Sequence, residues 1–164
     1  MTDPASSDLG ADLLAVVARL NRWATSRAAL PVPFAQARLI GMIDLLGPAR
    51  VSDLAAADHC SQPTMTNQLH RLADAGLVTR TPDPQDARAV LISLSDTGSA
   101  ALLAARRARG AAIEPYVASL SKDKLKKLSD AVTALRLLMD ELPMHPAPAE
   151  RGVGPADALA GAEV

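Results

Sequence analysis

The chain has 164 residues, a formal net charge of −1 at pH 7 and a hydrophobic content of 49%, although only 2% of its residues are aromatic. This length and composition predict one compact domain, or one domain with a tail. The single cysteine excludes an internal disulfide and suits a reducing cytoplasm. No apolar run reaches roughly 18 residues and no basic stretch precedes an apolar one at the N-terminus, so we expect neither a membrane span nor a signal peptide.

The first predicted helix follows a polar segment, residues 1–7, that we expect to be mobile. From Leu9 its apolar residues recur at alternating intervals of four and three positions, a narrow seam of the kind that helices use to pack on a partner. We expect Pro31 and Pro33 to end this helix, because proline disrupts a helix interior. The seam consists of Leu9, Leu13, Val16, Leu20 and Trp23.

A second helix is predicted over residues 34–46 and is stopped by Gly47-Pro48. Its apolar residues cover a wide arc, which indicates burial on more than one side. Arg50-Val51 is predicted to add a short strand. Ser52 should then cap a third helix of about two turns, which ends in a tight turn at residues 58–60.

The fourth predicted helix has two distinct faces. Ser61 should cap it and Gly76 should stop it, while Met65, Leu69 and Leu72 recur at the spacing of one buried face. The opposite face carries short polar side chains and one arginine, which are the types that meet base edges or phosphates in a major groove. These residues are Gln62, Thr64, Thr66, Asn67, His70 and Arg71.

A hairpin is predicted next. Residues 77–80 begin a strand, residues 81–86 form a turn-rich tip, and alternating apolar residues over 90–94 mark the return strand. A helix-turn-helix followed by a hairpin is a winged helix. We therefore predict a mainly α (α+β) fold, a winged helix-turn-helix domain with N- and C-terminal helices for dimerisation.

Two further helices follow the hairpin. Ser95 should cap a long alanine-rich helix, which Pro115 should kink or end. Ser121 should cap the last helix, whose apolar residues form a heptad seam that, with the N-terminal seam, predicts a homodimer. The heptad residues are Leu125, Leu128, Val132, Leu135, Met139 and Leu142.

These elements divide the chain into three parts. Residues 1–34 and 112–142 would form the dimerisation helices, and residues 35–111 would form the winged helix-turn-helix region. Proline, glycine and alanine dominate residues 143–164, which we predict to be a disordered tail.

Two motifs flank the return strand of the hairpin. Asp83–Arg88 reads D-P-x-D-x-R, and Leu94–Gly98 reads L-[TS]-x-x-G. In this pattern, its most specific feature, the central region resembles the MarR family of bacterial transcription regulators. Leu54-Ala55, Ser61–Thr66 and Leu72–Arg80 also match, and helix order extends the likeness more loosely over residues 8–142.

Four residues depart from those that the family often carries. His59 replaces a glycine in the turn, and histidine tolerates a left-handed conformation better than most residues. Asp58 replaces a leucine, Asn67 replaces an arginine, and Ala87 stands where a second basic residue is common. These departures bear on the operator sequence and the affinity more than on the fold.

The resemblance implies a homodimeric, sequence-specific regulator of transcription, chiefly a repressor, that binds double-stranded DNA. Its reading helices would enter major grooves at half-sites about 10 bp apart, which gives an inverted repeat. The net charge of −1 weighs against DNA binding, but the placement of basic groups counts for more than their total.

The fourth helix supplies most of the expected DNA contacts. The expected base readers include amides, which pair bidentately with adenine; they are Gln62, Thr66 and Asn67. Phosphate contacts set register without reading sequence; they are expected from Thr64, His70 and Arg71. Ser61 is the remaining residue of this helix that we expect to contact DNA.

Two arginines leave alternatives open. Arg71 either touches a phosphate or pairs internally with an acid. Arg88 resembles the family's wing arginine, which enters a minor groove, where an arginine suits the negative potential. The alternative for Arg88 is an ion pair with Asp86 inside the hairpin.

The family commonly binds small aromatic acids or phenols between the dimer helices and the DNA-reading domain. Apolar walls and a cation for such a ligand are available here, although core packing and surface arginines explain the same residues equally well. The candidate ligand residues are Trp23, Arg27, Phe34, Arg38 and Met42.

Other chemistry finds little support. Cys60 is either a redox sensor or a small packed hydrophobe, and its position matches a buried apolar residue. His59, His70 and His145 are too scattered for a metal site, and we expect neither metal nor cofactor. No nucleophile–base set or phosphate-binding glycine loop is present, so we do not expect an enzyme.

Two other functions stay open. One is a DNA-binding protein that responds to no effector, and the other is a helical dimer that works through protein partners.

Overall fold

The computed structural model describes residues 4–142, with all their side chains except those of residues 4–7 and Ala87. Helices α1 (Pro4–Arg27) and α2 (Phe34–Leu46) precede strand β1 (Ala49–Arg50) and helices α3 (Val51–Ala57) and α4 (Gln62–Asp74). Strands β2 (Val78–Asp83) and β3 (Asp86–Leu94) lead into the long helices α5 (Asp96–Ala118) and α6 (Lys122–Glu141). The predicted tail, residues 143–164, lies outside the described residues.

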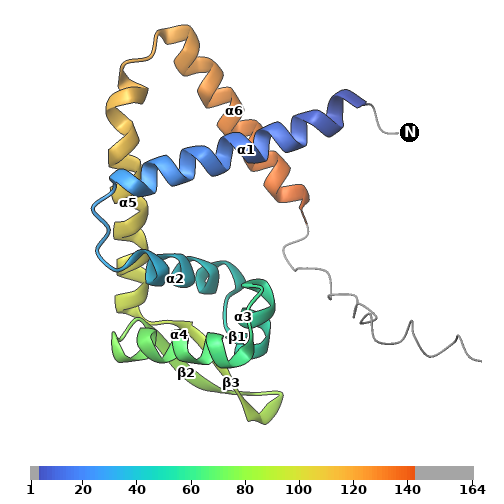
Figure 1. Ribbon diagram of the computed structural model, residues 1–164, viewed down its shortest axis with the longest axis vertical. Coiled ribbons are helices and arrows are strands. Elements are labelled where there is room, and N and C mark those ends of the chain that lie inside the picture. Colours follow the sequence, from blue (N-terminus) through green and yellow to red (C-terminus); the bar gives the residue numbers. More distant parts are fainter. Residues whose placement is uncertain (1–3, 143–164) are drawn as a thin grey trace, which may run out of the picture.

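The sheet and the short helices form one end of the molecule (Figure 1). The sheet is antiparallel with the strand order β1-β3-β2, and α2, α3 and α4 lie beside it. Helix α5 leads away from this end, packs against α1 and continues to α6 (Figure 1). This arrangement confirms the predicted winged helix-turn-helix fold.

The core is aliphatic and lies in the winged-helix end. It joins α2, α3, α4 and β3, and α5 adds Leu102 at its edge. In contrast, α6 has no buried residue, and Ala24 is the one buried residue among the described side chains of α1. The fully buried large side chains are Leu39, Ile40, Ile43, Leu54, Met65, Leu69, Leu72 and Ile92.

Several predicted boundaries are wrong by a few residues. Helix α1 begins at Pro4, within the segment expected to precede it, and ends at Arg27, before the prolines. The expected strand at Arg50-Val51 lies instead at Ala49–Arg50, because Val51 already belongs to α3.

The predicted Ser52 cap is also wrong. Strand β1 runs directly into α3, so the extended residue Arg50 takes the capping position. The Asp53 carboxylate accepts a hydrogen bond from the Arg50 backbone N–H at 3.4 Å. Ser52 lies inside the first turn, where its hydroxyl contacts the same carboxylate at 3.3 Å.

From the hairpin to α6, some of the predicted caps and boundaries are confirmed and others are wrong. The turn of the hairpin is shorter than predicted, because β2 continues to Asp83. Ser95 caps α5 as predicted and accepts from the Gly98 N–H at 3.0 Å. Pro115 does not end α5, which continues to Ala118. Ser121 occupies the capping position of α6 without a side-chain hydrogen bond to the helix.

Gly98 shows why a glycine follows the hairpin. A Cβ atom placed on Gly98 would lie 1.9 Å from the carbonyl oxygen of Leu77, which is far inside van der Waals contact. Because that oxygen belongs to the backbone, the helix must shift to admit a side chain. Gly98 thus allows the start of α5 to approach the segment between α4 and β2.

We therefore predict that Gly98→Ala lowers the free energy of unfolding by about 1–3 kcal/mol, the usual range for overpacking. Urea denaturation at equal protein concentration measures the change. Gly110→Ala is the matched control in the same helix, because nothing lies within 4 Å of its added Cβ. The control should be neutral or stabilising by up to about 1 kcal/mol, as alanine is the better helix former. Equal stabilities of the two variants would contradict this account.

Candidate nucleic-acid interface

The N-terminus of α4 is fixed by a side-chain cap. The Ser61 hydroxyl accepts a hydrogen bond from the Thr64 backbone N–H at 3.3 Å, and the two hydroxyl oxygens lie 2.9 Å apart. Pro63 falls in the first turn, where its missing N–H leaves no bond unmade. The predicted cap is confirmed, and it ties together two residues expected at DNA.

The two predicted faces of α4 are both present. Met65, Leu69 and Leu72 are 0% exposed, so the helix is seated firmly on the core. On the other face Thr66 is half-buried, and the remaining candidate side chains are exposed. No described ion pair involves Arg71, so its guanidinium is not committed to an acid within residues 4–142. The exposed candidates are Ser61, Gln62, Thr64, Asn67, His70 and Arg71.

The turn before α4 contains an ion pair that sequence reasoning missed. His59 has a φ of 50°, so it takes the left-handed conformation that a glycine often supplies. Asp58 pairs through both carboxylate oxygens with Arg38 of α2, and Nη2 of Arg38 lies 2.9 Å from Oδ2. The hydrogen bond from Arg38 lowers the pKa of Asp58, whose side chain is 8% exposed. The sequence feature that could have revealed this ion pair is Asp58 itself, an acid at a position where the family often has leucine.

Cys60 packs against the core beside this pair. Desolvation raises the pKa of its thiol, and the negative charge of Asp58 raises it further. Because the thiolate is the reactive form, these surroundings favour packing over redox sensing.

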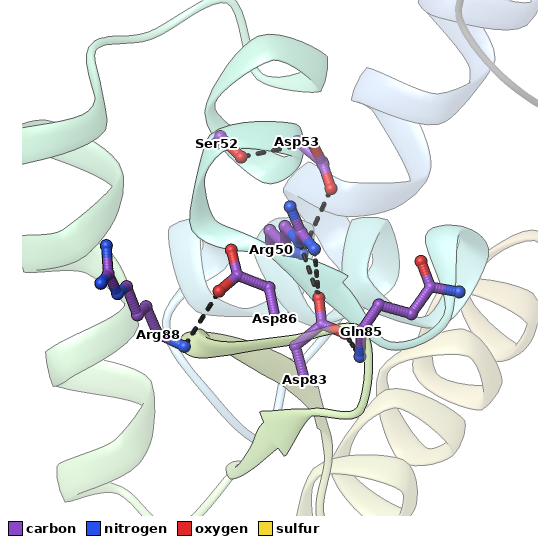
Figure 2. Close-up of polar contacts among 7 residues, drawn as sticks. All are labelled: Arg50, Ser52, Asp53, Asp83, Gln85, Asp86 and Arg88. Carbon is purple, nitrogen blue, oxygen red and sulfur yellow. Dashed lines mark hydrogen bonds and ion pairs between the residues drawn. The ribbon is translucent and has the colours of Figure 1, made fainter.

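The wing, residues 78–94, displays Arg88 on a bulge. Pro82 pairs with Val90, but the next residue, Asp83, pairs with Asp86. Residues 87–89 of β3 therefore have no partners on β2, and Arg88 lies in their centre. The Asp86 carboxylate accepts from the Arg88 backbone N–H at 3.0 Å, whereas no described ion pair engages the Arg88 guanidinium. Figure 2 shows this side chain leading away from the hairpin.

A second ion pair, also missed from the sequence, lies at the base of the wing tip (Figure 2). Nε and Nη2 of Arg50 lie 2.7 and 2.6 Å from Oδ2 of Asp83. The other carboxylate oxygen accepts from the Gln85 backbone N–H at 2.8 Å. That hydrogen bond, and then the one from Arg50, lower the pKa of Asp83. Asp83 is thus the one buried charged residue in the described part of the chain, with an exposed fraction of 7%.

A cleft of about 280 Å³ lies where α1, α2 and α5 meet. Of the candidate ligand residues, Phe34 and Arg38 line it, together with Arg106 and Arg109 of α5. Arg106 pairs with Asp44 at 2.8 Å. The Nε atom of Arg109 is buried and has no hydrogen-bond partner in the described part of the chain.

The other three candidate ligand residues lie outside this lining. Met42 packs against the core. The Arg27 guanidinium lies 4.6 Å from the centre of the Trp23 ring, and that ring meets Tyr116 edge to face at 5.1 Å. These contacts join α1 to α5.

Within residues 4–142, no group of three or more His, Cys, Asp and Glu residues could hold a metal ion. His145 lies outside the described residues. None of the described helices is both long and apolar enough to cross a membrane.

The chain is similar to known transcription regulators in sequence and in fold. Residues 35–90 match the family model described as the MarR family. An uncharacterized HTH-type transcriptional regulator from Mycobacterium bovis is 34% identical over 136 residues, which cover 82% of this chain and 95% of that protein. A transcriptional regulator from Thermotoga maritima is similar in structure, with a TM-score of 0.67 at 25% identity over 82% of this chain and 95% of the other.

A MepR variant from Staphylococcus aureus, solved bound to an oligodeoxyribonucleotide, shares the fold. Its TM-score is 0.56 at 19% identity, over 80% of this chain and 97% of the other.

The family match, the relatives and the fold together define a winged helix-turn-helix transcription regulator, which is a DNA-binding protein and not an enzyme. The chain belongs to the MarR family.

Proposed function

We propose that the protein is a homodimeric repressor that reads an inverted-repeat operator. The observation that carries this proposal is the pairing of an exposed polar face on α4 with an exposed arginine on the bulge of the wing. Each α4 would enter a major groove, and each Arg88 would enter the adjacent minor groove. In a bacterium the site of action would be the cytoplasm, where the DNA lies.

The side chains of α4 divide by their chemistry. Asn67 and Gln62 can pair bidentately with adenine, and Thr66 stands beside them for base contact. Ser61, Thr64, His70 and Arg71 lie where phosphates would pass, and contacts there fix register. The Ser61–Thr64 contact holds both hydroxyls at the N-terminal end of α4, where we propose that they meet phosphates.

We predict that the protein binds the promoter region beside its own gene and that Arg88→Ala weakens this binding. Removing one minor-groove cation should lower the salt slope of log Kobs by about one. Asn67→Ala should cost about 1–3 kcal/mol at one base position and relax the preference there. Gel shifts at several salt concentrations, with footprinting, measure both effects.

The control is Lys124→Ala, which removes one positive charge from the exposed start of α6. It should leave affinity and salt slope almost unchanged. If Arg88→Ala matched this control, the minor-groove role of the wing would be wrong.

The dimer is proposed from two uncovered apolar faces. In α6 every seam residue except the partly buried Leu135 is exposed, with Leu128 at 40%, Val132 at 42% and Met139 at 52%. Helix α1 likewise exposes Leu9 at 68% and Leu20 at 47%. Apolar stripes at heptad spacing bury themselves against a second copy, and a symmetric operator needs two reading helices. We retain residues 1–34 and 112–142 as the proposed dimerisation helices, although α5 is continuous across residue 112.

We predict that Leu128→Glu converts the dimer into a monomer, because a carboxylate in the seam would lose its hydration on assembly. Sedimentation velocity measures the change. Ala134→Glu, which adds the same charge to an exposed position of α6 off the seam, should leave the mass unchanged. A wild-type chain that sediments as a monomer would remove the dimer proposal.

We propose further that a small aromatic acid or phenol binds in the cleft at Phe34 and releases the DNA. The cleft offers an apolar wall and several guanidinium groups, of which Arg38 and Arg106 already have acidic partners. Arg109 is thus the cation best placed to receive a carboxylate. The ligand would act by favouring a dimer whose reading helices have the wrong spacing.

Benzoate should therefore lower the DNA affinity of the wild-type protein, and Arg109→Gln should abolish this response while DNA binding persists. Fluorescence anisotropy with labelled operator measures the affinity, and benzyl alcohol serves as a ligand without the charge. An affinity that is indifferent to benzoate and to phenol would favour a regulator without an effector of this class.

A further inference from the structure

We propose that the Arg50–Asp83 ion pair is a positioning device for the wing, which sets the direction in which Arg88 leaves the hairpin. This inference rests on the proposed contact between Arg88 and DNA. Neither Arg50 nor Asp83 need touch the DNA for the device to act.

The pair connects the two outer strands of the sheet. Arg50 belongs to β1 and Asp83 ends β2, while β3, which carries Arg88, runs between these strands. Two nitrogens of the guanidinium reach one carboxylate oxygen, at 2.7 and 2.6 Å. A planar guanidinium held through two nitrogens restricts direction as well as distance.

Two carboxylates hold the chain that leads into the bulge. Before the turn, Asp83 takes the Gln85 N–H at 2.8 Å on the oxygen that Arg50 leaves open. After the turn, Asp86 takes the Arg88 N–H at 3.0 Å. Residues 87–89 have no partners on β2, so the two carboxylates guide the chain from Asp83 as far as Arg88, and the Pro82–Val90 pair resumes the ladder after the bulge (Figure 2).

Apolar packing does little to hold this tip. A hollow of about 490 Å³ separates it from the start of α3 and is lined by Ser52, Asp53 and Gln85 as well as by the ion pair. Pro82, Pro84 and Val90 are all exposed. Arg50 also precedes α3, where its N–H contacts Asp53 at 3.4 Å. The ion pair is therefore the polar link from the wing tip to the helix-turn-helix.

Simple electrostatics and positioning predict opposite effects of removing the Asp83 charge on DNA affinity. Loss of a negative charge near a surface that meets phosphates should strengthen DNA binding. If Asp83 positions Arg88, its loss should instead weaken binding. The sign of the change therefore separates positioning from simple electrostatics.

The test is Asp83→Asn in the full-length protein, bound to the operator fragment by fluorescence anisotropy across a salt series. We expect a several-fold loss of affinity and a salt slope reduced toward that of Arg88→Ala. The double variant Asp83→Asn/Arg88→Ala should bind no more weakly than Arg88→Ala alone, because the first change acts through the second residue.

The matched control is Asp74→Asn, which removes an exposed acid at the end of α4 that no described ion pair engages. It should leave affinity unchanged or slightly higher. Arg50→Lys keeps the positive charge but loses the two-nitrogen contact, so it should weaken binding as Asp83→Asn does. If circular dichroism shows that Asp83→Asn is unfolded, Arg50→Lys serves as the test in its place.

The outcomes separate this inference from the proposed function. If Arg88→Ala weakens binding but Asp83→Asn and Arg50→Lys match the wild type or bind more tightly, the positioning role is wrong and DNA reading by the wing stands. Additive losses in the double variant would also overturn positioning. If Arg88→Ala itself has no effect, the proposed role of the wing fails first.

Discussion

The seating of α4 on the aliphatic core is the constraint on which the rest of the structure depends. Met65, Leu69 and Leu72 are fully buried, so α4 cannot turn about its axis without exposing apolar surface to water. The polar face is directed outward because the opposite face is held inward. The same core contains Ile92 of the wing and Leu102 of α5. The positions of reading helix, wing and long helix are therefore set by one set of apolar contacts.

Local patterns predicted α4 well because its determinants lie within a few residues of one another, as the Ser61 cap illustrates. The wing was predicted, but its turn was predicted too long and its bulge was missed. The alternation of apolar residues does not reveal a shift in strand register. The ion pairs Arg38–Asp58 and Arg50–Asp83 join residues 20 and 33 positions apart, so they become visible when the fold brings the partners together. Likewise, spacing could not show that Met42 faces the core while Phe34 lines a cleft.

The ion pairs also bear on the charge of the chain. Arg38, Arg50 and Arg106 each neutralise an acid of the fold, so they contribute to the total without offering an unpaired cation. Arg71 and Arg88, in contrast, have no ion pair among the described residues and lie on α4 and the wing. A net charge of −1 is thus compatible with a DNA-binding surface, because the arginines without an acidic partner lie on α4 and the wing while other arginines are paired with acids elsewhere.

Helix α5 is one uninterrupted element from the wing to the helices that lie beyond it. Its 23 residues correspond to a rod of about 35 Å at 1.5 Å per residue. Gly98 at one end abuts the backbone beside α4, and Tyr116 at the other end meets Trp23 of α1. Such a rod acts as a lever: a tilt of about 6° at the Tyr116 end would displace the far end by roughly 3.4 Å, which is the rise of one base pair. A tilt of α5 by this small angle would therefore move a reading head by about one step along DNA.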